Sequence, residues 1–209
     1  MLVLILSASL FAQLENTRWL STINTDGPIK VIFDFKKDSA AVYRLDSSLI
    51  ENMTFTHNDT SFTLHKVEGQ SDCDNSTPGV YRFSIRMEGM AVKLISDDCN
   101  DRSAVLDGTQ WTLWKEPVAV KVAGSMLIQY TGVYEFDAAH PITVTMENGT
   151  LYADGPNNGL PKSPLIPESD SRFFLRIAAV HWDFAKDANG KVVKLISHEQ
   201  KDYELKKVK

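Results

Sequence analysis

Short runs in which apolar and polar residues alternate are the feature of this sequence that most restricts its fold. Residues 29–35 are one such run, with Val31 and Phe33 on one face and Lys30 and Asp34 on the other. Because the side chains of a strand point alternately to its two faces, this pattern predicts a strand with one buried face. Turn residues interrupt similar runs about every ten positions. The sequence therefore predicts an all-β protein.

The runs fall into two groups, which predict two tandem antiparallel β domains. The first group holds eight runs, near residues 17, 29, 40, 51, 60, 79, 90 and 110, with a short helix predicted between Cys99 and Gly108. If the strand at Trp19 pairs with the strand at Trp111, this sheet closes into a barrel without exposed edges. Alternation begins again at Met126 and predicts a smaller barrel or a curled sheet. The expected divisions are a signal-peptide-like segment at 1–13, a lipocalin-like barrel at 14–116, a linker at 117–125 and a C-terminal β domain at 126–209.

One segment of the second group breaks the alternation. Residues 154–167 contain four prolines and two glycines. Since proline gives no N–H to a sheet, this composition predicts an irregular loop, in which only Leu165 and Ile166 pair briefly.

The first 13 residues and the two cysteines indicate the compartment. Residues 1–13 carry no charge, and they are shorter than the ~20 apolar residues that a membrane-spanning helix needs. They are typical of the hydrophobic part of a secretory signal, with cleavage after Ala12, so we expect a secreted or periplasmic protein without a membrane span. Cys73 and Cys99 are the only cysteines, and in an exported chain an even count predicts one structural disulfide.

Charge and motifs favour binding over catalysis. The net charge of -5 at pH 7 makes nucleic acid an unfavourable partner. The five histidines lie on separate predicted strands or turns, and the sequence contains no H-E-x-x-H, S-x-x-K or calcium-loop motif. We therefore expect no catalytic residues, no metal and no cofactor. A hydrolase stays open as a third alternative, because carboxylates that are distant in sequence can meet in the fold.

Aromatic residues of the predicted barrel give the strongest indication of a ligand. An eight-stranded barrel is just wide enough for one small molecule, so these rings either fill the core or surround an apolar ligand. The candidate ligand-binding residues are Phe33, Phe35, Tyr43, Phe55, Phe62, Tyr81, Phe83 and Trp111. The alternative function is an accessory module that docks a glycan, an envelope component or a partner enzyme through exposed aromatics such as Trp114 and Trp182.

Two parts of the sequence resemble known families. The run Asp98-Cys99-Asn100-Asp101-Arg102, followed by Leu106, Gly108 and Trp111, is similar to the closing segment of lipocalin-like domains in secreted bacterial proteins. Trp19 fits the first strand of such a domain, and the resemblance covers roughly residues 15–115. It implies a barrel that holds a small ligand.

The C-terminal part resembles an uncharacterised β domain that commonly trails bacterial β-lactamase-like serine hydrolases. The resemblance lies in Tyr130-Thr-Gly-Val-Tyr134, Leu165-Ile-Pro167, Phe173-Phe174 and Gly190-Lys-Val192. Because the sequence has no S-x-x-K motif, the resemblance implies only the appended domain and assigns no nucleophile or base.

Overall fold

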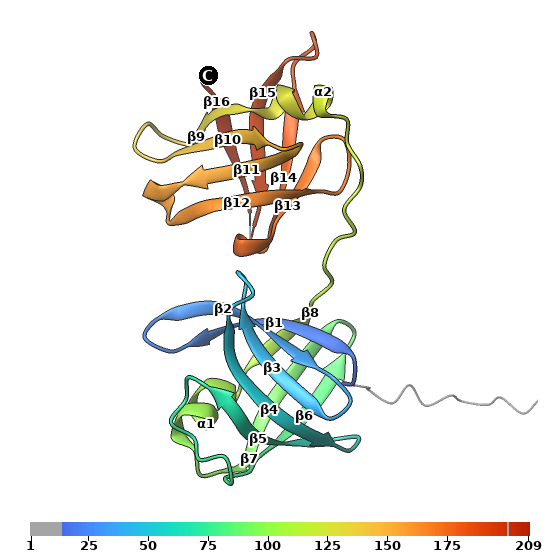
Figure 1. Ribbon diagram of the computed structural model, residues 1–209, viewed down its shortest axis with the longest axis vertical. Coiled ribbons are helices and arrows are strands. Elements are labelled where there is room, and N and C mark those ends of the chain that lie inside the picture. The colour runs from blue at the N-terminus through green and yellow to red at the C-terminus, as the bar shows by residue number, and fades with distance from the viewer. Residues whose placement is uncertain (1–13, 200) are drawn as a thin grey trace, which may run out of the picture. The chain divides into compact units, whose positions relative to one another are not determined.

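The computed structural model describes residues 14–199 and 201–209 (Figure 1). It divides the chain into two compact units, Met1–Lys115 and Glu116–Lys209. The signal-peptide-like segment predicted at 1–13 lies outside the described residues. No helix within the described part of the chain is both long enough and apolar enough to cross a bilayer.

The first unit is a closed antiparallel barrel of eight strands, in which each strand pairs with the next and the last pairs with the first. Its strands are β1 (Thr17–Asn24), β2 (Pro28–Phe35), β3 (Ser39–Arg44), β4 (Leu49–His57), β5 (Ser61–Gly69), β6 (Gly79–Arg86), β7 (Gly89–Asp97) and β8 (Gln110–Leu113). The barrel closes where Trp19 stands opposite Leu113. Helix α1 (Asn100–Leu106) connects β7 to β8, at the position predicted for a short helix.

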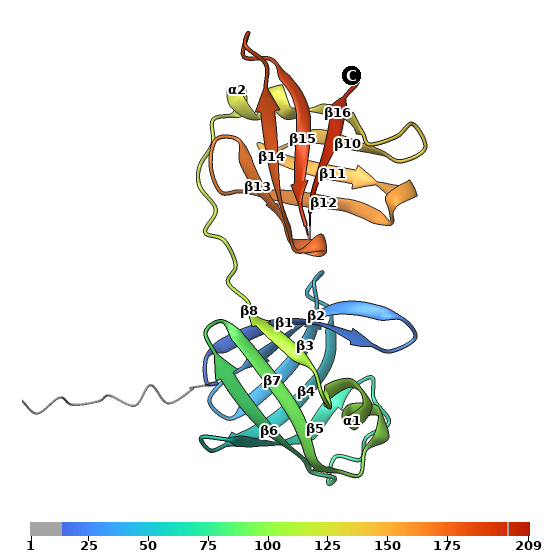
Figure 2. The same cartoon turned by 180° about the vertical axis from the view of Figure 1, so that it is seen from behind.

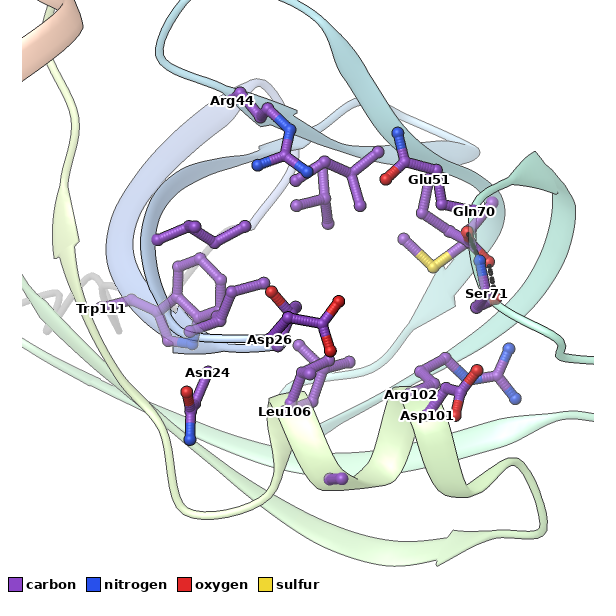
Figure 3. A pocket seen from close by; sticks show the side chains of 18 residues that line it. Asn24, Asp26, Arg44, Glu51, Gln70, Ser71, Asp101, Arg102, Leu106 and Trp111 are labelled. Atoms are coloured by element: carbon purple, nitrogen blue, oxygen red, sulfur yellow. Dashed lines mark hydrogen bonds between the residues drawn. The ribbon is translucent and has the colours of Figure 1, made fainter. Parts of the chain in front are cut away.

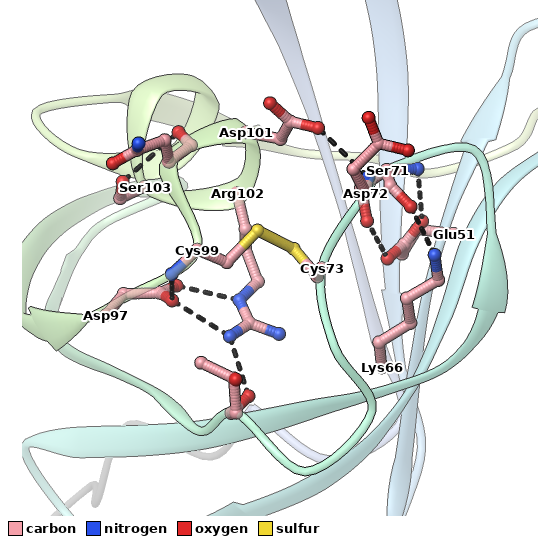
Figure 4. The surroundings of a disulfide bond; sticks show 12 residues. Glu51, Lys66, Ser71, Asp72, Cys73, Asp97, Cys99, Asp101, Arg102 and Ser103 are labelled. Carbon is pink, nitrogen blue, oxygen red and sulfur yellow. Dashed lines mark hydrogen bonds and ion pairs between the residues drawn. A yellow bond between two sulfur atoms is a disulfide. The ribbon is translucent and has the colours of Figure 1, made fainter.

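The disulfide between Cys73 and Cys99 is present, as predicted. Cys99 precedes the first residue of α1, and Cys73 lies in the loop between β5 and β6 (Figure 4). The bond therefore attaches this loop to the start of the helix.

The second unit is also a closed antiparallel barrel of eight strands, which confirms an all-β protein with two tandem barrels (Figure 2). Its strands are β9 (Gly132–Glu135), β10 (Pro141–Glu147), β11 (Thr150–Gly155), β12 (Leu160–Pro167), β13 (Arg172–Leu175), β14 (Val180–Lys186), β15 (Val192–His198) and β16 (Asp202–Lys207). Three short 3-10 turns, η1 (Ile128–Tyr130), η2 (Pro156–Asn158) and η3 (Arg176–Ala178), accompany them. Strand β9 pairs with both β10 and β16.

The loop predicted at 154–167 is wrong over most of its length, because β12 occupies residues 160–167. Two residues of this strand, Ser163 and Leu165, are buried. Their burial outweighs the poor strand preference of the prolines around them. Pairing with β11 is irregular, with a register shift between Ala153 and Gly155. The prolines thus disturb the ladder without preventing the strand.

The segment predicted as a linker at 117–125 contacts the second barrel. The Val120 N–H donates to the Pro167 carbonyl at 2.9 Å, and Val122 packs against the core of this unit. Helix α2 (Gly124–Leu127) follows and buries Leu127.

Candidate ligand-binding cavity

Most of the aromatic residues predicted to bind a ligand fill the middle of the first barrel. Trp111 is 2% exposed and belongs to the same core cluster as six of the others, which are at most 4% exposed: Phe33, Phe35, Phe55, Phe62, Tyr81 and Phe83. Their ring centroids lie 4.2–6.4 Å from those of their neighbours, which is the spacing of packed aromatic pairs. These six rings pack against one another.

Tyr43 does not line the interior, so its prediction as an inward-facing residue is wrong. Ala40 and Val42 of β3 belong to the core cluster, and Tyr43 follows Val42 directly. Since successive side chains point to opposite faces, Tyr43 faces outward and is partly exposed. The register of β3 on β4 shifts between Val42 and Tyr43, an irregularity that the sequence pattern did not indicate.

A cavity of about 490 Å³ opens at one end of this barrel, beside α1 (Figure 3). The turn between β1 and β2, the end of β3, the start of β4, the loop after β5 and α1 all contribute to its wall. Among the eight predicted ligand-binding residues, Trp111 is the one that lines it. The apolar part of the wall includes Ile23, Ile29, Ile50, Met53, Val105 and Trp111.

The polar part of the wall includes two carboxylates that are held by protein donors. Glu51 is buried, and its Oε1 accepts a hydrogen bond of 2.6 Å from the Ser71 hydroxyl. Asp101 Oδ2 accepts the N–H of Asp72 at 3.0 Å. The wall also contains the charged side chains of Asp26, Arg44 and Arg102.

A buried ion pair fixes α1 against the barrel and so fixes one wall of the cavity. Arg102 of α1 is 4% exposed and the Asp97 side chain is 0% exposed. Arg102 Nε donates to Asp97 Oδ2 at 2.7 Å, and Nη2 donates to Oδ1 at 2.9 Å (Figure 4). The same Nη2 also donates to the Thr77 carbonyl at 2.9 Å, and the Tyr81 hydroxyl donates to Asp97. The guanidinium of Arg102 is thus turned towards Asp97.

The pKa values of this cluster reflect burial and pairing. Burial alone would raise the pKa of Asp97, but hydrogen bonds from Arg102 and Tyr81 outweigh it and hold the pKa below its ordinary value. Burial, together with the Asp97 carboxylate, raises the pKa of the Tyr81 phenol. The cluster therefore contains an ionised pair and a neutral phenol, and its role is to hold structure. The sequence indicated Arg102 through its run after Cys99, but it gave no sign that Asp97 is the partner.

The histidines lie apart from this cavity. His57 and His65, which flank one predicted hairpin, do not face each other, since His65 stands opposite Thr54 and His57 opposite Phe62. In the second barrel His181 stands opposite His198. This pairing was not predicted, because the sequence alone does not define the register of β14 on β15.

Carboxylates surround both of these histidines. His181 Nδ1 lies 2.6 Å from Glu168 Oε2, while His198 lies 2.8 Å from both Asp202 and Asp183. Hydrogen bonding to Asp202, aided by Asp183, raises the pKa of His198. No group of side chains with the composition and spacing of a metal site occurs within residues 14–199 and 201–209.

The tryptophans predicted to be exposed are buried instead. Trp114 is 9% exposed and Trp182 is 3% exposed, and the Trp182 indole N–H donates to the Ser197 hydroxyl at 2.9 Å. The prediction was wrong because it did not fix which face of the strand the indole of Trp182 occupies. The exposed aromatic residue of the second barrel is Phe136, at 68%, beside Tyr203.

Comparison with known proteins identifies the second unit only. Residues 116–209 match the family model described as Domain of unknown function (DUF3471). The match is consistent with the resemblance of this part to a domain that trails β-lactamase-like proteins. A comparison with curated proteins gave no match. The similarity of residues 15–115 to lipocalin-like domains stays a prediction.

Proposed function

We propose that the chain is an exported, non-enzymatic binding protein, whose first barrel holds a small, largely apolar molecule in the cavity beside α1. The observation that carries this proposal is the cavity itself. Its volume of about 490 Å³ falls within the range of ~300–1,000 Å³ typical of small-molecule sites. Such sites combine an apolar wall with a few polar groups, which is also the composition of this wall.

The position of the cavity favours a preformed site. The disulfide and the Asp97–Arg102 pair both hold α1, and α1 forms part of the cavity wall. A wall that is fixed before binding loses little conformational freedom when the ligand enters, and this reduces the free-energy cost of binding. The same disulfide supports an oxidising compartment, because structural disulfides persist mainly outside the cytosol.

The proposal is tested by filling the cavity with a side chain. Ile29 lines the cavity and is only partly buried, so Ile29→Trp adds bulk to the binding space. Thr22 is exposed on the neighbouring strand β1 and does not line the cavity, so Thr22→Trp is the matched control. The probe is the uncharged dye N-phenyl-1-naphthylamine, whose fluorescence rises in an apolar site.

We expect the unmodified protein and Thr22→Trp to bind one dye molecule, and Ile29→Trp to bind at least about tenfold more weakly, a loss of about 1.4 kcal/mol. Near-ultraviolet circular dichroism checks that each variant remains folded. Equal binding by both variants would place the dye outside this cavity and refute the proposal, as would the absence of binding to the unmodified protein.

A further inference from the structure

Two charged side chains of the cavity wall have no hydrogen bond or ion pair with another side chain in the described part of the chain. They are Arg44, at the end of β3, and Asp26, in the turn between β1 and β2. In the view of Figure 3 they lie on opposite sides of the cavity, and the guanidinium of Arg44 points towards it. Hydrogen bonds from Ser48 lower the pKa of Asp46, and the nearby charge of Arg44 adds a smaller effect in the same direction.

The other charged groups of the wall already have partners. Arg102 is paired with Asp97, Glu51 accepts the Ser71 hydroxyl, and Asp101 accepts a backbone N–H. A ligand that enters the cavity therefore meets Arg44 as a cation whose guanidinium N–H groups are available as hydrogen-bond donors. A guanidinium offers five N–H donors in a planar arrangement that suits carboxylate, sulfonate and phosphate groups.

Burial decides between Arg44 and Asp26 as the group that selects the ligand. Arg44 is partly buried, whereas Asp26 is exposed on its turn. Water and salt screen an exposed charge more strongly than a partly buried one, so Arg44 acts on the ligand with the larger effect.

We propose that the cavity ligand is an amphiphile with an anionic head group, bound by the Arg44 guanidinium, and that its apolar body lies along Ile29, Met53 and Trp111. This inference rests on the proposed function and adds the chemical class of the ligand. It assigns Arg44 as the residue that distinguishes an anionic ligand from a neutral ligand of the same shape.

The test compares two dyes that differ in one charged group. 1-Anilinonaphthalene-8-sulfonate carries a sulfonate on the ring system of the uncharged N-phenyl-1-naphthylamine. Each dye is titrated into the full chain, into Arg44→Gln, and into Lys30→Gln, which removes a positive charge from an exposed position outside the cavity.

We expect the sulfonate dye to bind more tightly than the neutral dye to the unmodified protein. Arg44→Gln should weaken the sulfonate dye about tenfold and change the neutral dye by less than about twofold, because only the sulfonate accepts charge-assisted hydrogen bonds from Arg44 and partial exposure limits their strength. Lys30→Gln should leave both affinities within about twofold, because exposed charges are screened. The retained binding of the neutral dye also shows that Arg44→Gln is folded.

The variant Asp26→Asn should change the affinity for the sulfonate dye in the opposite direction to Arg44→Gln. Removing this carboxylate takes away a repulsion, so the sulfonate dye should bind slightly more tightly, by up to about threefold. Weaker binding of the sulfonate dye to Asp26→Asn would contradict the proposed orientation of the ligand and overturn the inference.

The remaining outcomes separate this inference from the proposed function. If both dyes bind equally and Arg44→Gln affects neither, the anionic head group is refuted while the cavity proposal stands, provided that Ile29→Trp still weakens the neutral dye. If neither dye binds to the unmodified protein, both proposals fail.

Discussion

Removing the charge of Arg102 tests whether the buried ion pair holds α1 in place. The Arg102→Leu variant leaves the Asp97 carboxylate, 0% exposed, without its cation. Breaking a buried pair in this way destabilises a protein by about 3–5 kcal/mol. Two donors to Asp97 remain in the variant, the Tyr81 hydroxyl and the Cys99 N–H at 2.8 Å. We therefore expect a loss near the lower limit, about 3 kcal/mol of the free energy of unfolding of the first barrel.

The pH dependence of this loss has a defined sign. In the unmodified protein the folded pKa of Asp97 lies below its ordinary value of 3.8, so the stabilisation is complete above that value and disappears as the pH falls through the folded pKa. In Arg102→Leu the cation is gone and burial favours the neutral acid. Protonation of Asp97 therefore reduces the loss of stability of the variant relative to the unmodified protein. The difference in stability between the two proteins should narrow from pH 7 towards pH 3.

Urea denaturation of the full chain is monitored by hydrogen exchange with mass spectrometry. This measures the free energy of unfolding of each barrel separately. The control is Arg172→Leu, since Arg172 is a 41% exposed arginine of the second barrel that also pairs with carboxylates. Exposed pairs contribute about 0–1 kcal/mol, so this variant should change little. A loss below about 1 kcal/mol in Arg102→Leu, or a difference that does not depend on pH, would refute the reasoning.

Three further variants probe the same fold. Replacing both Cys73 and Cys99 with serine opens a loop with a sequence separation of 26 residues, and it should destabilise the first barrel by about 3–4 kcal/mol on the chain-entropy estimate while urea denaturation of the second barrel is unchanged. Gly79→Ala should lower the first barrel's thermal midpoint, at a cost of about 1–3 kcal/mol, because the added Cβ would lie 2.4 Å from the Asp97 carboxylate; an unchanged midpoint would contradict this contact. His198→Gln should destabilise the second barrel by less than about 1 kcal/mol. Since the folded pKa of His198 is raised above 6.5, that loss should be full below pH 6.5 and vanish as the pH rises through the folded pKa, and a loss that grows with pH would show the wrong sign.

Most strands of the two barrels could be predicted because their residues satisfy a local rule. Runs such as Ile29 to Phe35 alternate over enough residues to define a buried face, and the turns between them contain the expected residue types. The short helix before β8 was also predicted from the sequence, in a segment that lacks the alternation of a strand. Burial against other strands overrode the local signal in β12, where the prolines indicated a loop.

Side-chain direction was predicted correctly in some strands and wrongly in others. Phe33 and Phe35 lie on the inner face of an unbroken strand, and both are in the core. Tyr43 follows three buried residues, Ala40 to Val42, so apolar side chains occupy both faces of β3 there, and the direction of Trp182 depends on which face of β14 is buried. Successive side chains of a strand face opposite sides, so an assignment that is wrong by one residue places a side chain on the wrong face. A local pattern alone could not decide the face of Tyr43 or Trp182.

The cavity could not be predicted because the residues that form it do not share a sequence pattern. Its wall combines a turn at Asp26, a strand end at Arg44 and the helix around Val105, which lie far apart in the chain. The disulfide, by contrast, followed from counting cysteines. What the sequence did not indicate is that this disulfide and Asp97 secure the helix that closes one side of the cavity.

The packing of the first barrel explains why the cavity lies at its end. An eight-stranded barrel is narrow enough for side chains to fill it, and the six buried aromatic residues from Phe33 to Phe83 pack together there. Replacing one of these rings with a small side chain would leave an empty space whose cost rises with its volume. At the end of the barrel the wall consists of turns, strand ends and α1, which border the cavity without filling it. The aromatic core therefore stabilises the barrel, while the helix held by Arg102 shapes the cavity.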